Sequence, residues 1–192
     1  MKHIHLYSLF LLIIGGMGLY IAYAGHAHRQ EMQRVENARI ILISKQEMKL
    51  RLIDYRGNEL LCAPVATGKN YGNKRKKGDM RTPEGVFQVS DIQDASGWMH
   101  DFGDGKGEIS GAYGNHFIRL SVPGQKGIGI HGTHLPESIG TRASEGCIRM
   151  HNEDLERLVK LIYPPLVVVI TPAKEDVKAD LALKGDEDMQ QL

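Results

Sequence analysis

Hydrophobic and polar positions alternate along the chain from residue 38 in a way that is typical of strands. The run Arg39-Ile40-Ile41-Leu42-Ile43 is apolar and β-branched, and Met48-Lys49-Leu50-Arg51-Leu52-Ile53 alternates apolar with charged positions. After the turn Arg56-Gly57-Asn58, residues 59–67 form a third such run. Period-two patterns bounded by turn residues predict strands. We therefore expect a three-stranded β-meander here.

Further apolar runs predict strands at residues 86–89, 116–120 and 166–170. One helix is expected between the last two, beginning at Asn152, whose side chain can cap its N-terminus. Its apolar face recurs at helical spacing: Leu155, Leu158, Val159 and Ile162. The fold class predicted is mostly β: a single β-rich domain with one main α-helix.

Residues 97–114 break the strand pattern with many glycines. Long loops without regular structure often form lids or binding loops. Trp98, Phe102 and Tyr113 could line a groove there. We expect an irregular loop beside a binding site.

The N-terminal segment is apolar enough to direct the chain to a membrane or to anchor it there. A short basic start precedes an apolar run from Leu6 to about Ala24. The run is near the length of a bilayer-spanning helix, and Ala22-Tyr23-Ala24 before Gly25 fits a signal-peptidase site. A cleaved signal peptide and an uncleaved membrane anchor both remain open, and the length favours the anchor. Either way, we expect export, to the periplasm or the extracytoplasmic face of the cytoplasmic membrane.

The chain is therefore expected to contain four segments. Residues 1–24 form a signal peptide or membrane anchor and residues 25–37 a polar linker. Residues 38–172 form the folded domain, and residues 173–192 a charged tail that is loose or a frayed helix. This length leaves room for one domain with a modest core.

Charge is nearly balanced, with 24 basic and 23 acidic residues and a formal net charge of +1. This balance gives no indication of a nucleic-acid partner. The most basic stretch is a loop at residues 69–77, Lys69-Asn70-Tyr71-Gly72-Asn73-Lys74-Arg75-Lys76-Lys77. It either attracts an anionic polymer or faces solvent, and the second case is the more common.

The first candidate for chemistry is His131, at the end of a strand-like run. Gly127, Gly129 and His131 alternate with two isoleucines and so share one face of the strand. Repeated glycine on one face indicates that another backbone or a substrate approaches closely. We expect the His131 ring to be sterically open on that face.

The second candidate is Cys147, which in an extended segment shares a face with Arg149. A thiol beside a guanidinium and within reach of an imidazole sits where its thiolate is favoured. Cys147 and His131 are thus a candidate nucleophile–base pair, although a free cysteine often only packs. A disulfide with Cys62 is not expected, because Cys62 lies in the apolar run Leu60-Leu61-Cys62-Ala63, which predicts a packed strand, and because a nucleophilic Cys147 must stay a free thiol.

A metal site is the competing interpretation of the same residues. His131, His134, Cys147 and His151 could supply nitrogen and sulfur ligands. Their spacings match no common zinc pattern, so we expect no metal and no other cofactor.

Several motifs surround the two candidates or lie upstream of them. They are His131-Gly132-Thr133, Ser144-x-Gly146-Cys147-Ile148-Arg149-Met150, Asn152, Asp154, Pro64-Val65-Ala66-Thr67-Gly68-Lys69, Gly78-Asp79 and Arg81-Thr82-Pro83-Glu84-Gly85-Val86-Phe87. Together these motifs resemble the L,D-transpeptidase catalytic domain (the YkuD-like or ErfK-like family). The resemblance covers most of residues 38–172. One departure is Glu145, where many members of the family carry His.

The resemblance implies a peptidoglycan L,D-transpeptidase. Its cysteine cleaves a stem tetrapeptide before the terminal D-Ala and transfers the acyl group to an amine, giving a 3-3 cross-link or an attached protein. With water as the acceptor, the enzyme is instead a carboxypeptidase or endopeptidase. A non-catalytic cell-wall-binding module is the alternative of another class. The expected partners are stem peptides, carbapenem-type inhibitors and, through the N-terminal segment, a membrane.

The roles follow residue by residue. Cys147 is the expected nucleophile and His131 the base. The backbone N–H groups of Gly146 and Cys147 are candidates for the oxyanion hole, and Gly132 for holding the imidazole. Arg149 either binds a substrate carboxylate, holds the thiolate, or forms a structural salt bridge. Two further residues are assigned to substrate binding: Ser144 and His116.

Overall fold

The computed structural model describes the backbone of residues 2–103 and 105–189, and the side chains of residues 14–103 and 105–183. The chain divides into two compact units, residues 1–38 and 39–192.

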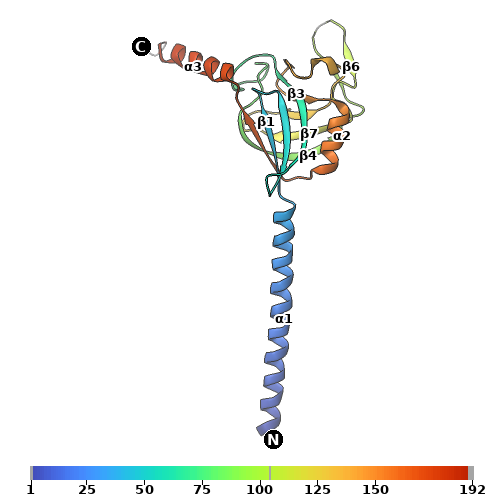
Figure 1. The fold of residues 1–192 in the computed structure, drawn as a ribbon, viewed down its shortest axis with the longest axis vertical. Helices are drawn as coiled ribbons and strands as arrows, with labels where there is room; N and C mark the ends of the chain where they lie inside the picture. The colour runs from blue at the N-terminus through green and yellow to red at the C-terminus, as the bar shows by residue number, and fades with distance from the viewer. Residues whose placement is uncertain (1, 104, 190–192) are drawn as a thin grey trace. The chain divides into compact units, whose positions relative to one another are not determined.

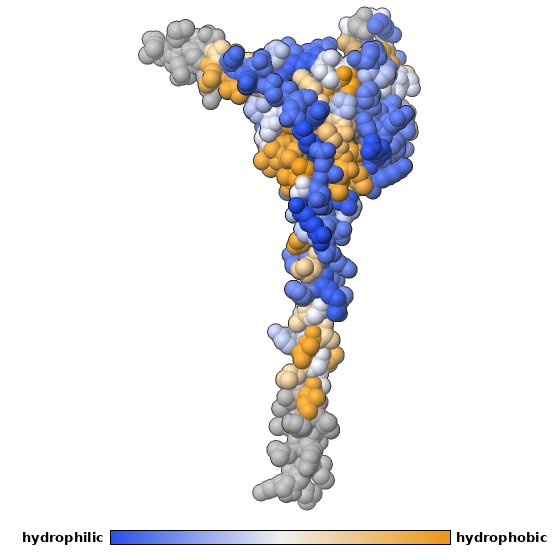
Figure 2. All heavy atoms as spheres, in the orientation of Figure 1, coloured by the Kyte–Doolittle hydropathy of each residue, from blue (hydrophilic) through white to orange (hydrophobic). Residues whose placement is uncertain are grey.

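The first unit is the single helix α1 (Lys2–Glu36). The apolar side chains described on it are exposed: Ile14, Met17, Leu19, Tyr20, Ile21 and Tyr23. Figure 2 shows orange atoms mixed with paler ones along this part of the helix, followed toward residue 36 by mostly hydrophilic ones. The predicted signal or anchor also includes residues 1–13, whose side chains lie outside the described set. Among the described residues, no helix has the length and apolarity needed to cross a membrane.

The second unit is built around one nine-stranded sheet, in the order β10-β8-β7-β4-β11-β1-β2-β3-β9. Figure 1 labels β1, β3, β4 and β7 of this sheet and shows α2 beside it. The strands of this sheet are β1 (Arg39–Ser44), β2 (Lys49–Asp54), β3 (Glu59–Gly68), β4 (Gly85–Asp94), β7 (His116–Ser121), β8 (Gly129–His131), β9 (Arg142–Ser144), β10 (Ile148–Met150) and β11 (Leu166–Thr171). β10 pairs with β8 on one side and with β3 on the other. This double pairing closes the sheet into a barrel, which removes two exposed edges.

The elements with the clearest periodicity are confirmed. β1, β2 and β3 are consecutive antiparallel neighbours, as expected for a meander. The helix expected from residue 152 is α2 (Asn152–Leu161), which buries Leu155 and Leu158 completely. Its N-cap is His151, without a side-chain cap hydrogen bond, so the capping role predicted for Asn152 is wrong. The Asn152 side chain is used elsewhere, as described below.

The glycine-rich stretch differs from the expected irregular loop. It contains β5 (Met99–Asp101) and β6 (Glu108–Ser110), which pair as an antiparallel hairpin in a sheet of their own. Three-residue strands are too short to show a period-two pattern, so the sequence gives no signal for them. This β5–β6 hairpin forms one side of the site.

The charged segment after residue 172 begins as part of the folded unit, with α3 (Lys174–Met189). Asp176 in its first turn is fully buried and accepts hydrogen bonds from the Gly72 N–H at 2.8 Å and the Arg142 guanidinium at 2.7 Å. Its carboxylate also lies 3.0 Å from the buried Lys45 ammonium. Burial of paired charges cannot be read from a charge-rich sequence, which is normally solvated.

Candidate active site

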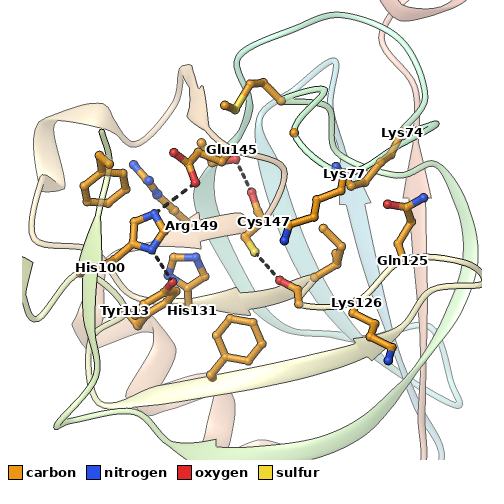
Figure 3. Close-up of a pocket in the computed structure, with 18 of the residues that line it drawn as sticks. Lys74, Lys77, His100, Tyr113, Gln125, Lys126, His131, Glu145, Cys147 and Arg149 are labelled. Atoms are coloured by element: carbon orange, nitrogen blue, oxygen red, sulfur yellow. Dashed lines mark hydrogen bonds and ion pairs between the residues drawn. The ribbon is translucent and has the colours of Figure 1, made fainter. Parts of the chain in front are cut away.

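Cys147 and His131 line the same cavity, which has a volume of about 620 Å³ (Figure 3). Its walls come from the β5–β6 hairpin, β7, β8, the basic loop and the Cys147 loop (residues 145–147). The predicted groove residues Trp98, Phe102 and Tyr113 are confirmed as part of the lining. The thiol donates a hydrogen bond to the Gly127 carbonyl oxygen, with a sulfur–oxygen distance of 3.3 Å.

The Cys147 loop is held by local hydrogen bonds and by the turn before β4. The Ser144 hydroxyl donates to the Cys147 carbonyl at 2.5 Å and accepts from the Gly146 N–H at 3.1 Å. Gly146 has a φ of +134°, and a Cβ there would lie 2.8 Å from the Arg81 carbonyl oxygen. The Thr82 hydroxyl donates to the Gly146 carbonyl at 3.0 Å. Only glycine fits this backbone conformation and this close approach.

His131 is buried, with 3% of its surface exposed. Its Nδ1 lies 2.7 Å from the carbonyl oxygen of Gly132, the residue that the sequence suggested as its holder. A carbonyl can only accept, so Nδ1 carries the proton and Nε2 is left as the acceptor nitrogen. The imidazole is therefore in the tautomer that a base at Nε2 requires.

The segment after His131 is fixed by Asn152. The Asn152 side chain accepts a hydrogen bond from the Thr133 N–H at 2.9 Å and donates to the Thr133 carbonyl at 3.2 Å. A Cβ on Gly132 would collide with the Asn152 amide oxygen. Asn152 thus joins α2 to the backbone that positions the imidazole.

The face of β8 at Gly129 is not open, which corrects the sequence-based expectation. A Cβ at Gly129 would collide with the Phe117 ring and lie 2.7 Å from the Ile118 carbonyl oxygen. The Phe117 ring stacks on the imidazole of His131, with centroids 5.6 Å apart and an interplanar angle of 13°. The missing side chain makes room for an aromatic ring that orients His131.

Both candidate groups are held in their neutral forms. Burial lowers the pKa of His131 to about 3, against a weaker opposite effect of the Gly132 hydrogen bond. Burial raises the pKa of Cys147, although the Gly129 backbone, Arg149 and Lys74 act against it. The expectation that Arg149 makes the thiolate the favoured form is therefore wrong, because desolvation outweighs the nearby positive charges.

Arg149 lies in β10 with its backbone opposite His131, and 5% of its surface is exposed. Its guanidinium carbon is 5.1 Å from the centroid of the Phe102 ring. Its Nε is buried without a hydrogen-bond partner, and it forms no salt bridge with any carboxylate that the structure describes. The structural salt bridge considered from the sequence is thus not found among the described residues.

Two residues were missed because they lie far from Cys147 in sequence. His100 Nε2 lies 3.1 Å from the Glu145 carboxylate, and the Tyr113 hydroxyl is 3.0 Å from His100 Nδ1 (Figure 3). Phe117 is the other, stacked on His131. The only sequence signal for His100 was a histidine inside a glycine-rich stretch that also contains aromatic residues.

The two further residues assigned to substrate binding lie differently. Ser144 lines the cavity, but its hydroxyl is engaged within the Cys147 loop. His116 lies in β7 outside the lining, where its Nε2 is 3.3 Å from the Glu156 carboxylate on α2. The structure therefore does not bring His116 to the site.

Within the part of the chain that the structure describes, no group of three or more His, Cys, Asp or Glu residues is placed to hold a metal ion. Both cysteines are free thiols, and Cys62 is exposed on β3 rather than packed.

Comparison with known proteins supports the motif-based resemblance. YkuD of Bacillus licheniformis is 33% identical over 132 residues, which cover 69% of this chain and 65% of that protein. YqjB of Bacillus subtilis is 35% identical, covering 56% of this chain and 57% of that protein. The matched region thus spans less than two thirds of either relative.

Solved structures share the fold. The helical cell shape determining protein Pgp2 of Campylobacter jejuni aligns with a TM-score of 0.52 at 24% identity, covering 72% of this chain and 49% of that chain. The catalytic domain of the Enterococcus faecium L,D-transpeptidase aligns with a TM-score of 0.52 at 20% identity, covering 70% of this chain and 97% of that domain. Residues 38–170 also match the family description of the L,D-transpeptidase catalytic domain, YkuD. The chain therefore belongs to the YkuD family of L,D-transpeptidase catalytic domains.

Proposed function

We propose that this chain is a peptidoglycan L,D-transpeptidase with Cys147 as its nucleophile and His131 as its base. The observation that carries the proposal is that both line one cavity, in a chain of this family. The acyl donor is a stem tetrapeptide, cleaved before its terminal D-Ala.

The neutral state of both groups defines how the reaction would start. The thiol first leaves its hydrogen bond to the Gly127 carbonyl oxygen. As Cys147 Sγ then attacks the scissile carbonyl carbon, Nε2 of His131 accepts the thiol proton. The tetrahedral intermediate then collapses, the C–N bond breaks, and His131 returns that proton to the departing D-Ala amine. A thioester remains on Cys147. An acceptor amine attacks the thioester, forms the new amide, and regenerates the thiol after proton transfer through His131.

The oxyanion that forms needs backbone donors near Cys147. The Gly146 N–H donates to Ser144 in this structure, so it would serve only after that hydrogen bond is released. The Cys147 N–H is the remaining candidate of the two that the sequence suggested.

Arg149 is proposed to bind the terminal carboxylate of the donor peptide. Its buried Nε lacks a partner, and an unpaired buried polar group is costly until a ligand satisfies it. A guanidinium can bind a carboxylate through two parallel hydrogen bonds.

Hydrolysis is the second candidate reaction, because water can attack the same thioester. A non-catalytic wall-binding module is the third candidate, but such a module has no need of a thiol hydrogen-bonded in a cavity beside an oriented imidazole. Solved structures of this fold include an avibactam carbamoyl enzyme and a complex with a faropenem-derived adduct. We propose that carbapenem-type inhibitors acylate Cys147 of this chain.

The N-terminal segment is proposed to place the domain outside the cytoplasmic membrane, as an anchor or a cleaved signal. The exposed apolar side chains on the described part of α1 support this proposal. Fractionation of cells that express the full chain tests it, since cytoplasmic recovery of the chain would contradict it.

The experiment for the reaction is mass spectrometry of purified tetrapeptide muropeptides incubated with the full chain. Loss of D-Ala with formation of a dimer supports transfer, and loss of D-Ala alone supports hydrolysis. Unchanged muropeptides would contradict both reactions and favour a binding module.

A further inference from the structure

The walls of the cavity carry an excess of positive charge. Its described lining includes four cationic side chains and one carboxylate: Lys74, Lys77, Lys126, Arg149 and Glu145. The carboxylate is already engaged by His100. A cavity lined by one sign of charge raises the local concentration of ligands of the opposite sign.

These cations are not equivalent, because only some are compensated. Lys74 is nearly buried, and its ammonium lies 2.8 Å from the Asp79 carboxylate. Lys77 and Lys126 are both exposed, and neither forms an ion pair within residues 14–103 and 105–183. Their charges are therefore available to a ligand at the mouth of the cavity.

The backbone under these two lysines is ordered, which separates them from lysines on a loose solvated loop. The Asp79 carboxylate accepts hydrogen bonds from the N–H groups of Arg75 at 2.7 Å, Lys76 at 3.0 Å and Arg81 at 3.2 Å. These bonds fold the basic loop around one carboxylate. Lys77 therefore extends from a fixed turn.

Lys126 follows a second turn, closed by a hydrogen bond of 3.1 Å from the Gln125 N–H to the Val122 carbonyl. The Gln125 side chain also donates to the Arg75 carbonyl at 3.3 Å. This contact ties the Lys126 turn to the basic loop, although the two are about 50 residues apart. Both lysines line the cavity, and in Figure 3 both lie on the same side of Cys147; we call them the rim of Lys77 and Lys126.

In Figure 3, Cys147 lies between Arg149 on one side and Lys77 on the other. We propose that the rim of Lys77 and Lys126 is a specificity-determining subsite that binds a free carboxylate of the donor peptide, upstream of the bond that is cleaved. This inference rests on the proposed function, which gives Arg149 the carboxylate downstream of that bond. A donor with negative charges on both sides of the scissile carbonyl would then be held across Cys147.

The chemistry predicts a preference between stem peptides of the same length. A stem whose upstream side-chain carboxyl groups are free offers an anion to the rim, whereas a stem whose carboxyl groups are amidated does not. The enzyme should therefore discriminate against amidated stems. The preference should weaken as added salt screens these exposed charges.

Calorimetry of the full chain carrying Cys147→Ala tests this preference, because that variant binds donors without consuming them. The two ligands are a disaccharide-tetrapeptide with free upstream carboxylates and the same compound with these groups amidated. Two exposed ion pairs are expected to make the free acid bind about tenfold more tightly. Adding Lys77→Gln and Lys126→Gln should weaken binding of the free acid to the level of the amide and leave the amide unchanged.

Lys76→Gln is the matched control, since Lys76 is exposed on the same loop but does not line the cavity. It should leave both affinities unchanged. Equal affinities for acid and amide, loss of both in the double variant, or binding of neither ligand would overturn the subsite. The proposed function fails separately, if the wild-type chain releases no D-Ala from the free-acid donor.

Discussion

Glu145 connects the Cys147 loop to the β5–β6 hairpin through His100, whose Nε2 lies 3.1 Å from the Glu145 carboxylate. A carboxylate only accepts at neutral pH, so Nε2 donates. Nδ1 of His100 is then free to accept from the Tyr113 hydroxyl at 3.0 Å. The residue that departs from the family pattern thus joins two walls of the cavity and does not contact His131 in any described hydrogen bond.

Glu145→Gln should therefore have a small effect on turnover. The amide oxygen can still accept from His100, and His131 remains as the base. We expect a rate change of less than about tenfold, against a loss on the order of 10²–10⁴-fold for His131→Ala. Release of D-Ala under saturating donor measures both. A loss with Glu145→Gln as deep as that with His131→Ala would place Glu145 in the catalytic machinery.

Cys147→Ala should abolish turnover while the domain stays folded. The thiol is the only proposed group that can form the thioester, and removing one sulfur atom from a cavity wall leaves the packing around it intact. Cys62→Ala is the matched control, because Cys62 is exposed on β3 and should be dispensable. Circular dichroism should be unchanged in both variants. Activity that survives Cys147→Ala, or disappears with Cys62→Ala in a folded protein, would reverse the assignment.

Gly129→Ala should displace the Phe117 ring and with it the imidazole of His131. Overpacking of a buried position typically costs about 1–3 kcal/mol. We expect a loss of stability of that size and a lower kcat, measured by urea denaturation and by D-Ala release. Gly97→Ala is the control, since nothing lies within 4 Å of a Cβ built there. If Gly129→Ala behaved like Gly97→Ala, Phe117 would not position His131.

The parts of the molecule that sequence predicts are those with a local cause. β1 to β3 and α2 could be predicted because their apolar periodicity is carried by adjacent residues. The pairing of Cys147 with His131 could be suggested from their motifs. The use of Gly129 could not, because a glycine does not reveal which side chain from another strand fills its space.

The remaining features depend on contacts between distant segments. His100 meets Glu145 only because the hairpin folds over the cavity, and Asp176 is buried only because Lys45 and Arg142 surround it. The protonation states of Cys147 and His131 depend on burial, which the sequence does not give. These features arise from contacts between segments that are far apart in sequence, so composition and spacing carry no signal for them.

A carbapenem should form a covalent adduct on Cys147, detected as a mass increase of the intact chain. A strained acylating agent reacts with the cysteine that would otherwise form the thioester and stays attached to it. The adduct should be absent from Cys147→Ala and unaffected by a chelator. A chain that releases D-Ala but gives no adduct would show that the cavity excludes the inhibitor, and one inert to both would favour the wall-binding module.

The rate of that acylation should depend little on pH between 5 and 8. The pKa of His131 is lowered to about 3, so the imidazole stays neutral and able to accept a proton throughout this range. An imidazole with its ordinary pKa near 6.5 would be protonated by pH 5, and the rate would fall about 30-fold. A route through preformed thiolate would instead lose about tenfold in rate for each pH unit of acidification, because burial raises the pKa of Cys147.

The pH dependence of stability follows from the same lowered pKa of His131. As the pH falls, His131 is protonated in the unfolded chain at a higher pH than in the folded chain. Stability is therefore full above about pH 6.5 and falls toward pH 3. Circular dichroism at each pH separates loss of fold from loss of rate, and a steep decline in the folded protein would contradict a neutral thiol–imidazole pair.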